Sequence, residues 1–134
     1  MIELLQWTNE YSVGVADIDD QHKKLFQLIN EFLKSIAKNE QKQAITTAIE
    51  KMSSYVEYHF KHEETYLKKH PEYSQHHKEH GAFAIKTLKL IPLVNTEPSA
   101  ADRELLEYLV VWLQNHVLGT DIKHFRYLKE NKLI

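Results

Sequence analysis

The sequence contains no cysteine, which excludes disulfide bonds, thiolate zinc sites and iron–sulfur clusters. Glycine and proline are scarce, with three of each in 134 residues, so long stretches contain no residue that breaks a helix. No apolar run approaches the roughly 20 residues that span a bilayer, and the amino terminus lacks the features of a secretory signal. These absences predict an all-α protein without membrane insertion, and we expect it in the cytoplasm.

The chain also lacks an excess of charge of either sign. Lysine and arginine number 17 and aspartate and glutamate 19, for a formal net charge of -2. Nucleic acid binds to clustered positive charge, so it is not an expected partner. A chain of 134 residues has the usual size of one domain, and we expect a single domain over residues 1–134.

Four stretches carry inward-facing residues at alternating spacings of three and four, the rhythm of one face of an α-helix. They cover roughly residues 18–38, 41–69, 73–91 and a fourth stretch from 99. Four amphipathic helices with short links most simply form an up-down-up-down four-helix bundle. The segment before Asp17 lacks this rhythm. We expect it to form an extended N-terminal arm that packs Trp7, Tyr11 and Val13 across the bundle.

Helix boundaries can also be predicted from single residues. Asp17 and Asp19 are candidate N-caps of the first helix, and Ser99, just after Pro98, is a candidate cap of the fourth. Pro92 is expected to end the third helix, because proline has no N–H to donate and clashes with the preceding turn.

Polar residues interrupt the inward stripe of every expected helix. A buried imidazole or carboxylate without a partner costs on the order of 1–3 kcal/mol or more. One core histidine is usually a hydrogen-bonded structural residue, but polar residues on all four stripes indicate a shared ligand. Imidazole nitrogens and carboxylate oxygens bind iron, zinc, manganese or copper. The candidate metal ligands are His22, His59, Glu63, His76, His80 and His116, together with the nearby Asp121.

The stretch HHKEH, residues 76–80, places three histidines in five positions. His76 and His80 lie one helical turn apart and continue the stripe to Phe83, so they are the expected ligands. His77 falls on the solvent side. We expect the histidines outside the stripes to lie at the surface or to support the ligands; they are His62, His70, His77 and His124.

The number of candidate ligands favours two metal ions over one. A tetrahedral zinc needs four ligands, and a two-histidine, one-carboxylate iron needs three protein ligands. Two octahedral ions that share two bridging carboxylates fit better. The imidazoles, the two bridges and one shared solvent-derived oxygen then fill all but one coordination position. That open position can bind an exogenous diatomic molecule without displacing a protein ligand.

The spacing of His116 and Asp121 requires an irregular helix. Residues five apart are separated by about 140° around an ideal α-helix, so both cannot point inward from a regular one. Gly119 lies between them and tolerates the backbone angles that end a helix. We therefore expect the fourth helix to end or distort near Gly119.

The motifs around these residues resemble those of the bacterial hemerythrins. The matching stretches are DIDDQHKKL around His22, HFKHEE with His59 and Glu63, HHKEH with His76 and His80, and HVLGTD with His116 and Asp121. The opening WTNEYSVGVADID matches as well, so the resemblance covers nearly the whole chain. It differs at Ile122 and His124, where family members often have lysine and tyrosine.

This resemblance implies a hemerythrin-like domain with a non-haem di-iron centre, bridged by two carboxylates and an oxo or hydroxo group. It implies that His76, His80 and His116 ligate one iron, that His22 and His59 ligate the other, and that Glu63 and Asp121 bridge them. The implied function is reversible binding of dioxygen as a peroxide at the second iron. Azide or a similar small anion would bind the oxidised form, and an oxygen-consuming enzyme would receive the oxygen.

The ligand set favours an oxygen carrier over an enzyme. Ferritin-like di-iron proteins use four glutamates and two histidines, whereas this chain offers mostly neutral imidazoles, which stabilise high-valent iron less. Two alternatives remain, namely a di-iron oxidase or scavenger of peroxide or nitric oxide, and a module that senses oxygen or iron. A dry oxygen pocket is expected from residues that would equally suit an ordinary bundle core: Leu25, Phe60, Trp112, Leu113 and Val117.

Overall fold

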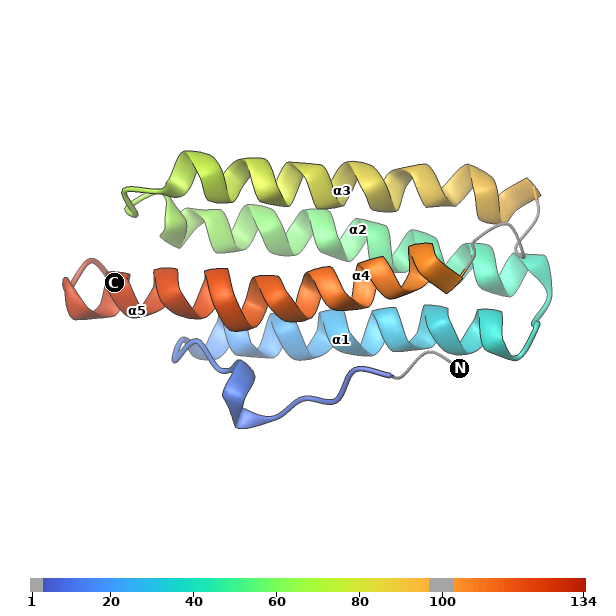
Figure 1. The fold of residues 1–134 in the computed structure, drawn as a ribbon, viewed down its shortest axis with the longest axis horizontal. Coiled ribbons are helices and arrows are strands. Elements are labelled where there is room, and N and C mark those ends of the chain that lie inside the picture. The colour runs from blue at the N-terminus through green and yellow to red at the C-terminus, as the bar shows by residue number, and fades with distance from the viewer. Residues whose placement is uncertain (1–3, 97–102) are drawn as a thin grey trace.

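Helices occupy most of the chain, as the shortage of glycine and proline predicts. The computed structural model describes residues 4–96 and 103–134, and within them no strand occurs (Figure 1). The helices are α1 (Ala16–Ala37), α2 (Lys42–Leu67), α3 (Tyr73–Thr96), α4 (Arg103–Asn115), the π-helical segment η3 (His116–Asp121) and α5 (Ile122–Glu130).

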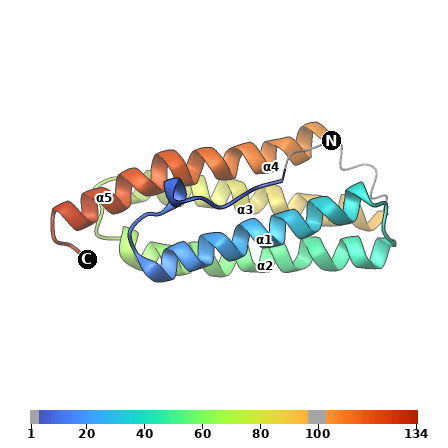
Figure 2. The ribbon, with the colours of Figure 1, turned by 90° about the horizontal axis from the view of Figure 1, so that it is seen from below.

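Successive helices run in opposite directions and form an up-down-up-down four-helix bundle (Figures 1 and 2). The segments α4, η3 and α5 follow one another without a break and together form the fourth rod of the bundle. The predicted fold class is therefore confirmed. Among the helices in the described ranges, none is both long enough and apolar enough to cross a membrane.

The N-terminal arm lies across α1 and the fourth rod (Figure 2). It contains one short 3-10 turn, η1 (Asn9–Tyr11). The ring centroids of Trp7 and Tyr11 lie 5.6 Å and 4.8 Å from that of Phe26 on α1, and Tyr11 and Val13 are buried. The predicted arm is confirmed, and its aromatic side chains extend the core between two helices.

A turn at Gly14 fastens the end of the arm to α5. The φ angle of Gly14 is +77°, a conformation that side chains with a Cβ rarely adopt. Lys129 Nζ donates a hydrogen bond to the Gly14 carbonyl at 3.0 Å, and a Cβ on Gly14 would lie 2.8 Å from the same nitrogen. The backbone angle favours glycine here, and a Cβ would also push the end of the Lys129 side chain away from its hydrogen bond.

The predicted caps of α1 are wrong. The N-cap residue is Val15, which makes no side-chain cap, and Asp17 and Asp19 lie inside the first turn. Asp19 instead accepts hydrogen bonds from the Val13 N–H at 2.8 Å and from the Ser12 hydroxyl at 2.5 Å. Its carboxylate therefore joins the arm to α1, and both acids offset the positive end of the helix dipole.

The third helix continues past Pro92 to Thr96, which corrects the prediction that Pro92 ends it. Proline cannot donate to the carbonyl of Leu88 one turn earlier. Both residues are exposed, so water can hydrogen-bond that carbonyl and the helix loses little. The predicted cap Ser99 lies outside the described residues.

Two apolar layers enclose a polar layer inside the bundle. The main hydrophobic cluster contains buried residues of the arm and of all four rods, and each fully buried apolar side chain contributes roughly 1.5–3 kcal/mol. A smaller cluster consists of Val13, Ile18, Leu67, Phe125 and Leu128. Along each helix the candidate ligands lie between these clusters. On α1, for example, His22 lies between Ile18 of the small cluster and Leu25 of the main one.

Candidate metal centre

The structure brings together all of the side chains that the sequence suggests as ligands. They project from all four rods of the bundle, and every one is buried. The set is His22 from α1, His59 and Glu63 from α2, His76 and His80 from α3, and His116 and Asp121 from η3.

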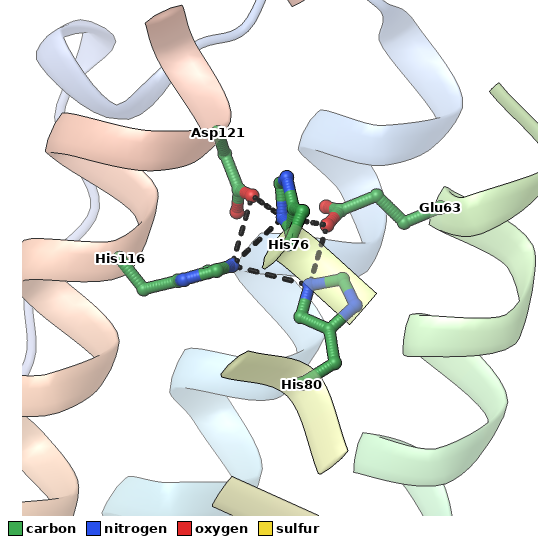
Figure 3. A group of neighbouring side chains, drawn as sticks. All are labelled: Glu63, His76, His80, His116 and Asp121. Carbon is green, nitrogen blue, oxygen red and sulfur yellow. Dashed lines mark hydrogen bonds and ion pairs between the residues drawn. The ribbon is translucent and has the colours of Figure 1, made fainter. Parts of the chain in front are cut away.

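Three of the histidines form one group (Figure 3). The Nε2 atoms of His76 and His80 each lie 3.1 Å from Nε2 of His116. Asp121 Oδ1 lies 2.9 Å from His76 Nε2 and 3.0 Å from His116 Nε2, and Glu63 Oε1 lies 3.1 Å from His80 Nε2. One ligand atom from each of these five residues lies within 4.8 Å of the others, a spacing that one metal ion can bridge.

The remaining two histidines form a second group on the other side of the carboxylates. Glu63 Oε2 lies 3.0 Å from His22 Nε2 and 3.2 Å from His59 Nε2, and Asp121 Oδ2 lies 3.3 Å from His22 Nε2. Each carboxylate therefore presents one oxygen to the three-histidine group and the other oxygen to the two-histidine group.

Hydrogen bonds alone do not satisfy the polar atoms of this cluster. Among the described residues, two buried carboxylate oxygens that face the histidines, Glu63 Oε1 and Asp121 Oδ1, have no hydrogen-bond partner of acceptable geometry. The Nδ1 atom of His22 is also unpaired, but it lies on the outer side of its ring. A buried unpaired polar group costs about 1–3 kcal/mol. A cation accepts lone pairs from carboxylate oxygens and imidazole nitrogens at once, so the donor set fits bound metal better than a hydrogen-bond network.

A π-helical turn allows His116 and Asp121 to face the same way. In η3 the hydrogen bonds reach five residues along the chain instead of four, so residues five apart come onto one face. The predicted distortion near Gly119 is confirmed. Its attribution to glycine is wrong, because the φ angle of Gly119 is not positive, and the helix resumes as α5 rather than ending.

The sequence profile of the hemerythrin HHE cation binding domain matches residues 13–128. The chain belongs to the hemerythrin family. It is 30% identical over 121 residues to a bacteriohemerythrin of Clostridium acetobutylicum, covering 86% of this chain and 94% of that protein. It is also 31% identical over 124 residues to a myohemerythrin of Theromyzon tessulatum, covering 91% and 92%.

The bundle also superimposes on hemerythrin crystal structures. A wild-type hemerythrin has a TM-score of 0.83 with 25% sequence identity, over 92% of this chain and 97% of that one. The likeness to hemerythrins therefore includes both the sequence, over residues 13–128, and the arrangement of the helices.

Without metal, protons balance the charge of the hemerythrin cluster. Burial alone lowers the pKa of His22, but hydrogen bonds to Asp121 and Glu63 outweigh it and raise the pKa from 6.5 to about 10. The same carboxylates raise the pKa of His76 to about 9 against the effect of burial. Burial raises the pKa of both carboxyl groups, but the surrounding imidazoles hold both below their ordinary values. Metal binding must therefore displace protons from the histidines.

The outer ring nitrogen of most candidate ligands contacts another side chain. The Nδ1 contacts are His59 with Gln21 at 2.8 Å, His76 with His124 at 2.7 Å, His80 with Glu64 at 2.9 Å and His116 with Glu79 at 3.4 Å. An acceptor at Nδ1 holds the proton there and leaves the Nε2 lone pair facing the cluster. The sequence reasoning missed Gln21, Glu64 and Glu79. The available signal was adjacency, since Gln21 precedes His22 and Glu64 follows Glu63.

Glu64 holds three side chains at the edge of the site. It accepts hydrogen bonds from His77 Nδ1 at 2.6 Å and from the Tyr73 hydroxyl at 2.9 Å, in addition to the bond from His80. Burial would raise its pKa, but these three hydrogen bonds lower it to about 2. Glu64 therefore stays ionised and orients the His80 ring at neutral pH.

The histidines outside the stripes separate into two kinds. The His77 side chain is 62% exposed, and His62 is partly exposed and lies 2.6 Å from Asp17. His70 and His124 are buried and stack with ring centroids 4.0 Å apart. The first pair lies towards the surface, and the second pair packs beneath the candidate ligands; the sequence predicted these two placements without assigning them to particular histidines.

The residues predicted to line an oxygen pocket lie on the main-core side of the cluster. The Phe60 ring stacks on His80 at 3.9 Å, and the Trp112 ring stacks on His116 at 4.5 Å. Aromatic rings therefore cover one face of two candidate ligands. All of these residues are buried except Trp112, which is partly buried against the core: Leu25, Phe60, Trp112, Leu113 and Val117.

Replacing Gly119 with alanine is expected to raise the stability of the protein. Its φ is not positive, and no atom lies within 4 Å of the position that a Cβ would take. Alanine reduces the entropy of the unfolded chain, so we expect a gain of about 0.4–1 kcal/mol in chemical denaturation. Gly14→Ala is the matched control and should destabilise. A loss of stability in Gly119→Ala would show that the π turn needs glycine.

Proposed function

We propose that this hemerythrin binds dioxygen reversibly at a pair of non-haem iron ions, as an oxygen carrier or store. The observation that carries the proposal is the division of each carboxylate between two histidine groups, with Glu63 Oε1 facing His80 and Oε2 facing His22. Two carboxylates shared between unequal histidine groups support two ions held side by side, of which one would have fewer protein ligands.

In this proposal, His76, His80 and His116 hold one iron and His22 and His59 hold the other, while Glu63 and Asp121 bridge them. The two-histidine side keeps a position free for an exogenous ligand. Iron held there would supply the electrons that capture dioxygen and would recover them on release. The chain itself fixes the ligands, through helices on four sides and the Nδ1 contacts that orient the rings.

The charge of the candidate ligands supports an oxygen carrier over a di-iron oxidase. Five of the buried donors are imidazoles and two are carboxylates, and ferritin-like di-iron proteins carry twice as many carboxylates. A less anionic site favours the lower oxidation states of iron, so it suits the return of oxygen unchanged. We propose a binding protein rather than an enzyme on this ground.

The apolar wall next to the site excludes water. Leu25 and Val117 have no exposed surface, and Leu113 is 1% exposed. A dry wall keeps protons from reaching a bound ligand and so slows irreversible oxidation of the centre.

An absorption spectrum of the reduced, iron-loaded protein tests the proposal. Metal analysis should give two irons per chain. Exposure to air should produce a new spectrum that returns to that of the reduced protein when oxygen is removed, and azide should perturb the oxidised form. Sustained reduction of oxygen by an added reductant, without a recoverable oxygenated spectrum, would favour an oxidase. One zinc per chain after native purification would contradict the di-iron assignment.

A polar residue in the apolar wall is expected to shorten the life of the oxygenated form. Leu113→Asn places an amide that binds water in the proposed pocket, so the oxygenated spectrum should decay irreversibly several times faster than in the parent, with both irons retained. Stopped-flow absorption measures the decay. Leu118→Asn is the matched control, because Leu118 is in the same rod and 41% exposed. Equal decay rates for the two variants would refute the pocket assignment and leave the ligands untouched.

A further inference from the structure

His76 and His124 share one hydrogen bond through equivalent ring nitrogens. Their Nδ1 atoms lie 2.7 Å apart, and both side chains are buried, with exposures of 0% and 5%. Only one proton fits between two nitrogens at this distance. One ring therefore donates and the other accepts, and the choice determines which nitrogen of His76 is left for the cluster.

The far side of His124 indicates the direction of this bond. His124 Nε2 lies 3.4 Å from Glu72 Oε2, and the Glu72 side chain is 57% exposed. A carboxylate can only accept, so it favours a proton on His124 Nε2 and leaves His124 Nδ1 as a lone pair. His76 must then donate from Nδ1, so its Nε2, which faces His116 and Asp121, is the nitrogen that gives a lone pair to a metal once its proton is displaced.

His70 holds the His124 ring and the Glu72 backbone in place. The rings of His70 and His124 stack with an angle of 20° between their planes. His70 Nδ1 accepts a hydrogen bond from the Glu72 N–H at 2.9 Å, so the His70 lone pair at Nδ1 is already used. The His124 ring therefore has a fixed plane, with His76 Nδ1 on one side and the Glu72 carboxylate on the other.

We propose that His124 is a positioning residue for the metal centre, which selects the Nδ1–H form of His76 and connects that ligand through Glu72 to the protein surface. The proposal rests on the proposed function in taking His76 as a metal ligand. The proposal excludes a second cation site at His124. His70, Glu72 and His124 also lie close enough to hold a cation, but a cation at His124 Nε2 would move the His124 proton to Nδ1 and would disable His76.

The tautomers can be read directly from the zinc-loaded protein by nitrogen-15 NMR, because Zn²⁺ is diamagnetic and binds imidazole. We expect a protonated Nδ1 and a metal-bound Nε2 on His76, with a scalar coupling across the bond to His124 Nδ1. On His124, the proton should be on Nε2. A proton on His124 Nδ1, or no coupling between the two rings, would overturn the proposal in the parent protein itself.

Variants at position 124 separate positioning from simple packing. His124→Phe keeps a ring on His70 and removes the acceptor, and should weaken Zn²⁺ affinity about 10-fold to 100-fold, as for other residues that orient a metal ligand. His124→Asn places an amide oxygen near the former Nδ1 and should restore most of the affinity. His62→Phe is the matched control, because it breaks a histidine–carboxylate pair away from the cluster.

Three outcomes would contradict the assignment. Unchanged Zn²⁺ affinity in His124→Phe would show that His76 needs no acceptor, and equal weakening in the Phe and Asn variants would assign the effect to packing. Loss of a third bound zinc in His124→Phe, with the other two retained, would favour a cation site at His70, Glu72 and His124. None of these measurements involves oxygen, so failure of the oxygen-binding proposal would be seen separately in the absorption spectrum.

Discussion

His76→Ala is expected to lose metal, whereas His77→Ala keeps it. The His76 imidazole is fully buried with its Nε2 among three other candidate ligand atoms. Its removal takes away a donor and leaves a cavity, so we expect metal affinity to fall by more than about 100-fold, beyond the effect of losing an orienting contact. Metal analysis after dialysis and the absorption spectrum measure the loss.

His77→Ala is the matched control because the two histidines are neighbours in the chain. The His77 side chain is largely exposed, and its partner Glu64 keeps its bonds to His80 and Tyr73 when His77 is removed. The free energy of unfolding should change by less than about 0.5 kcal/mol. Metal loss in His77→Ala together with retention in His76→Ala would reverse the assignment of the two rings.

Removing the metal is expected to destabilise the bundle and to make its stability depend on pH. A ligand present at about a thousand times its dissociation constant contributes about 4 kcal/mol to the folded state, and losing this should lower the melting temperature on the order of 15 °C. Calorimetry with and without a chelator measures the difference. An unchanged melting temperature after chelation would show that the cluster is stable without metal.

The pH dependence of the metal-free protein follows from its pKa values. His22 and His76 have pKa values of about 10 and about 9 in the folded chain, above the ordinary 6.5. Their stabilisation is complete below about pH 6.5 and is lost as the pH rises towards 9 to 10. The lowered pKa values of Glu63 and Asp121 stabilise above their ordinary 4.5 and 3.8, and this contribution is lost in acid.

Measurement of the melting temperature at different pH values tests this pH dependence for the metal-free protein. The melting temperature should be highest between about pH 4.5 and 6.5 and should fall on the alkaline side. The metal-loaded protein should instead hold its stability into alkaline solution and release metal in acid, because its histidines bind metal only when deprotonated. A melting temperature of the stripped protein that stays constant from pH 6.5 to 9 would contradict the balance of charge described for the cluster.

The periodic part of the fold could be predicted from the sequence. Burial repeats with the period of the helix, so the inward positions of α1, such as Ile18, His22 and Leu25, follow from their spacing. Polar residues at such positions stand out against the apolar rule, which is why the cluster was recognisable before any coordinates. The boundary residues were less predictable. A proline in an exposed turn, as at Pro92, costs too little to end a helix.

Contacts between helices were harder to predict because they have no period in the sequence. Glu64 and Gln21 orient ligands on other helices, and their only signal in the sequence is that they are adjacent to the candidate ligands Glu63 and His22. His124 was expected only at the surface or beside the ligands, and its bond to His76 depends on the rotation of α5. That rotation is set by the π turn, whose extra residue cannot be located from the stripe of α4 alone.

The π-helical segment also bears on how the length of this chain can change. In an ordinary helix, one inserted residue rotates everything beyond it by about 100°, which would turn Phe125 and Leu128 out of the core. Here the extra residue between His116 and Asp121 is absorbed within η3, and both residues of α5 remain buried. A chain that lacked the exposed Leu118 would place His116 and Asp121 four apart on a regular α-helix, with the same faces inward. We therefore expect the bundle to accommodate a single-residue deletion at this point while keeping the candidate metal ligands and the core in register.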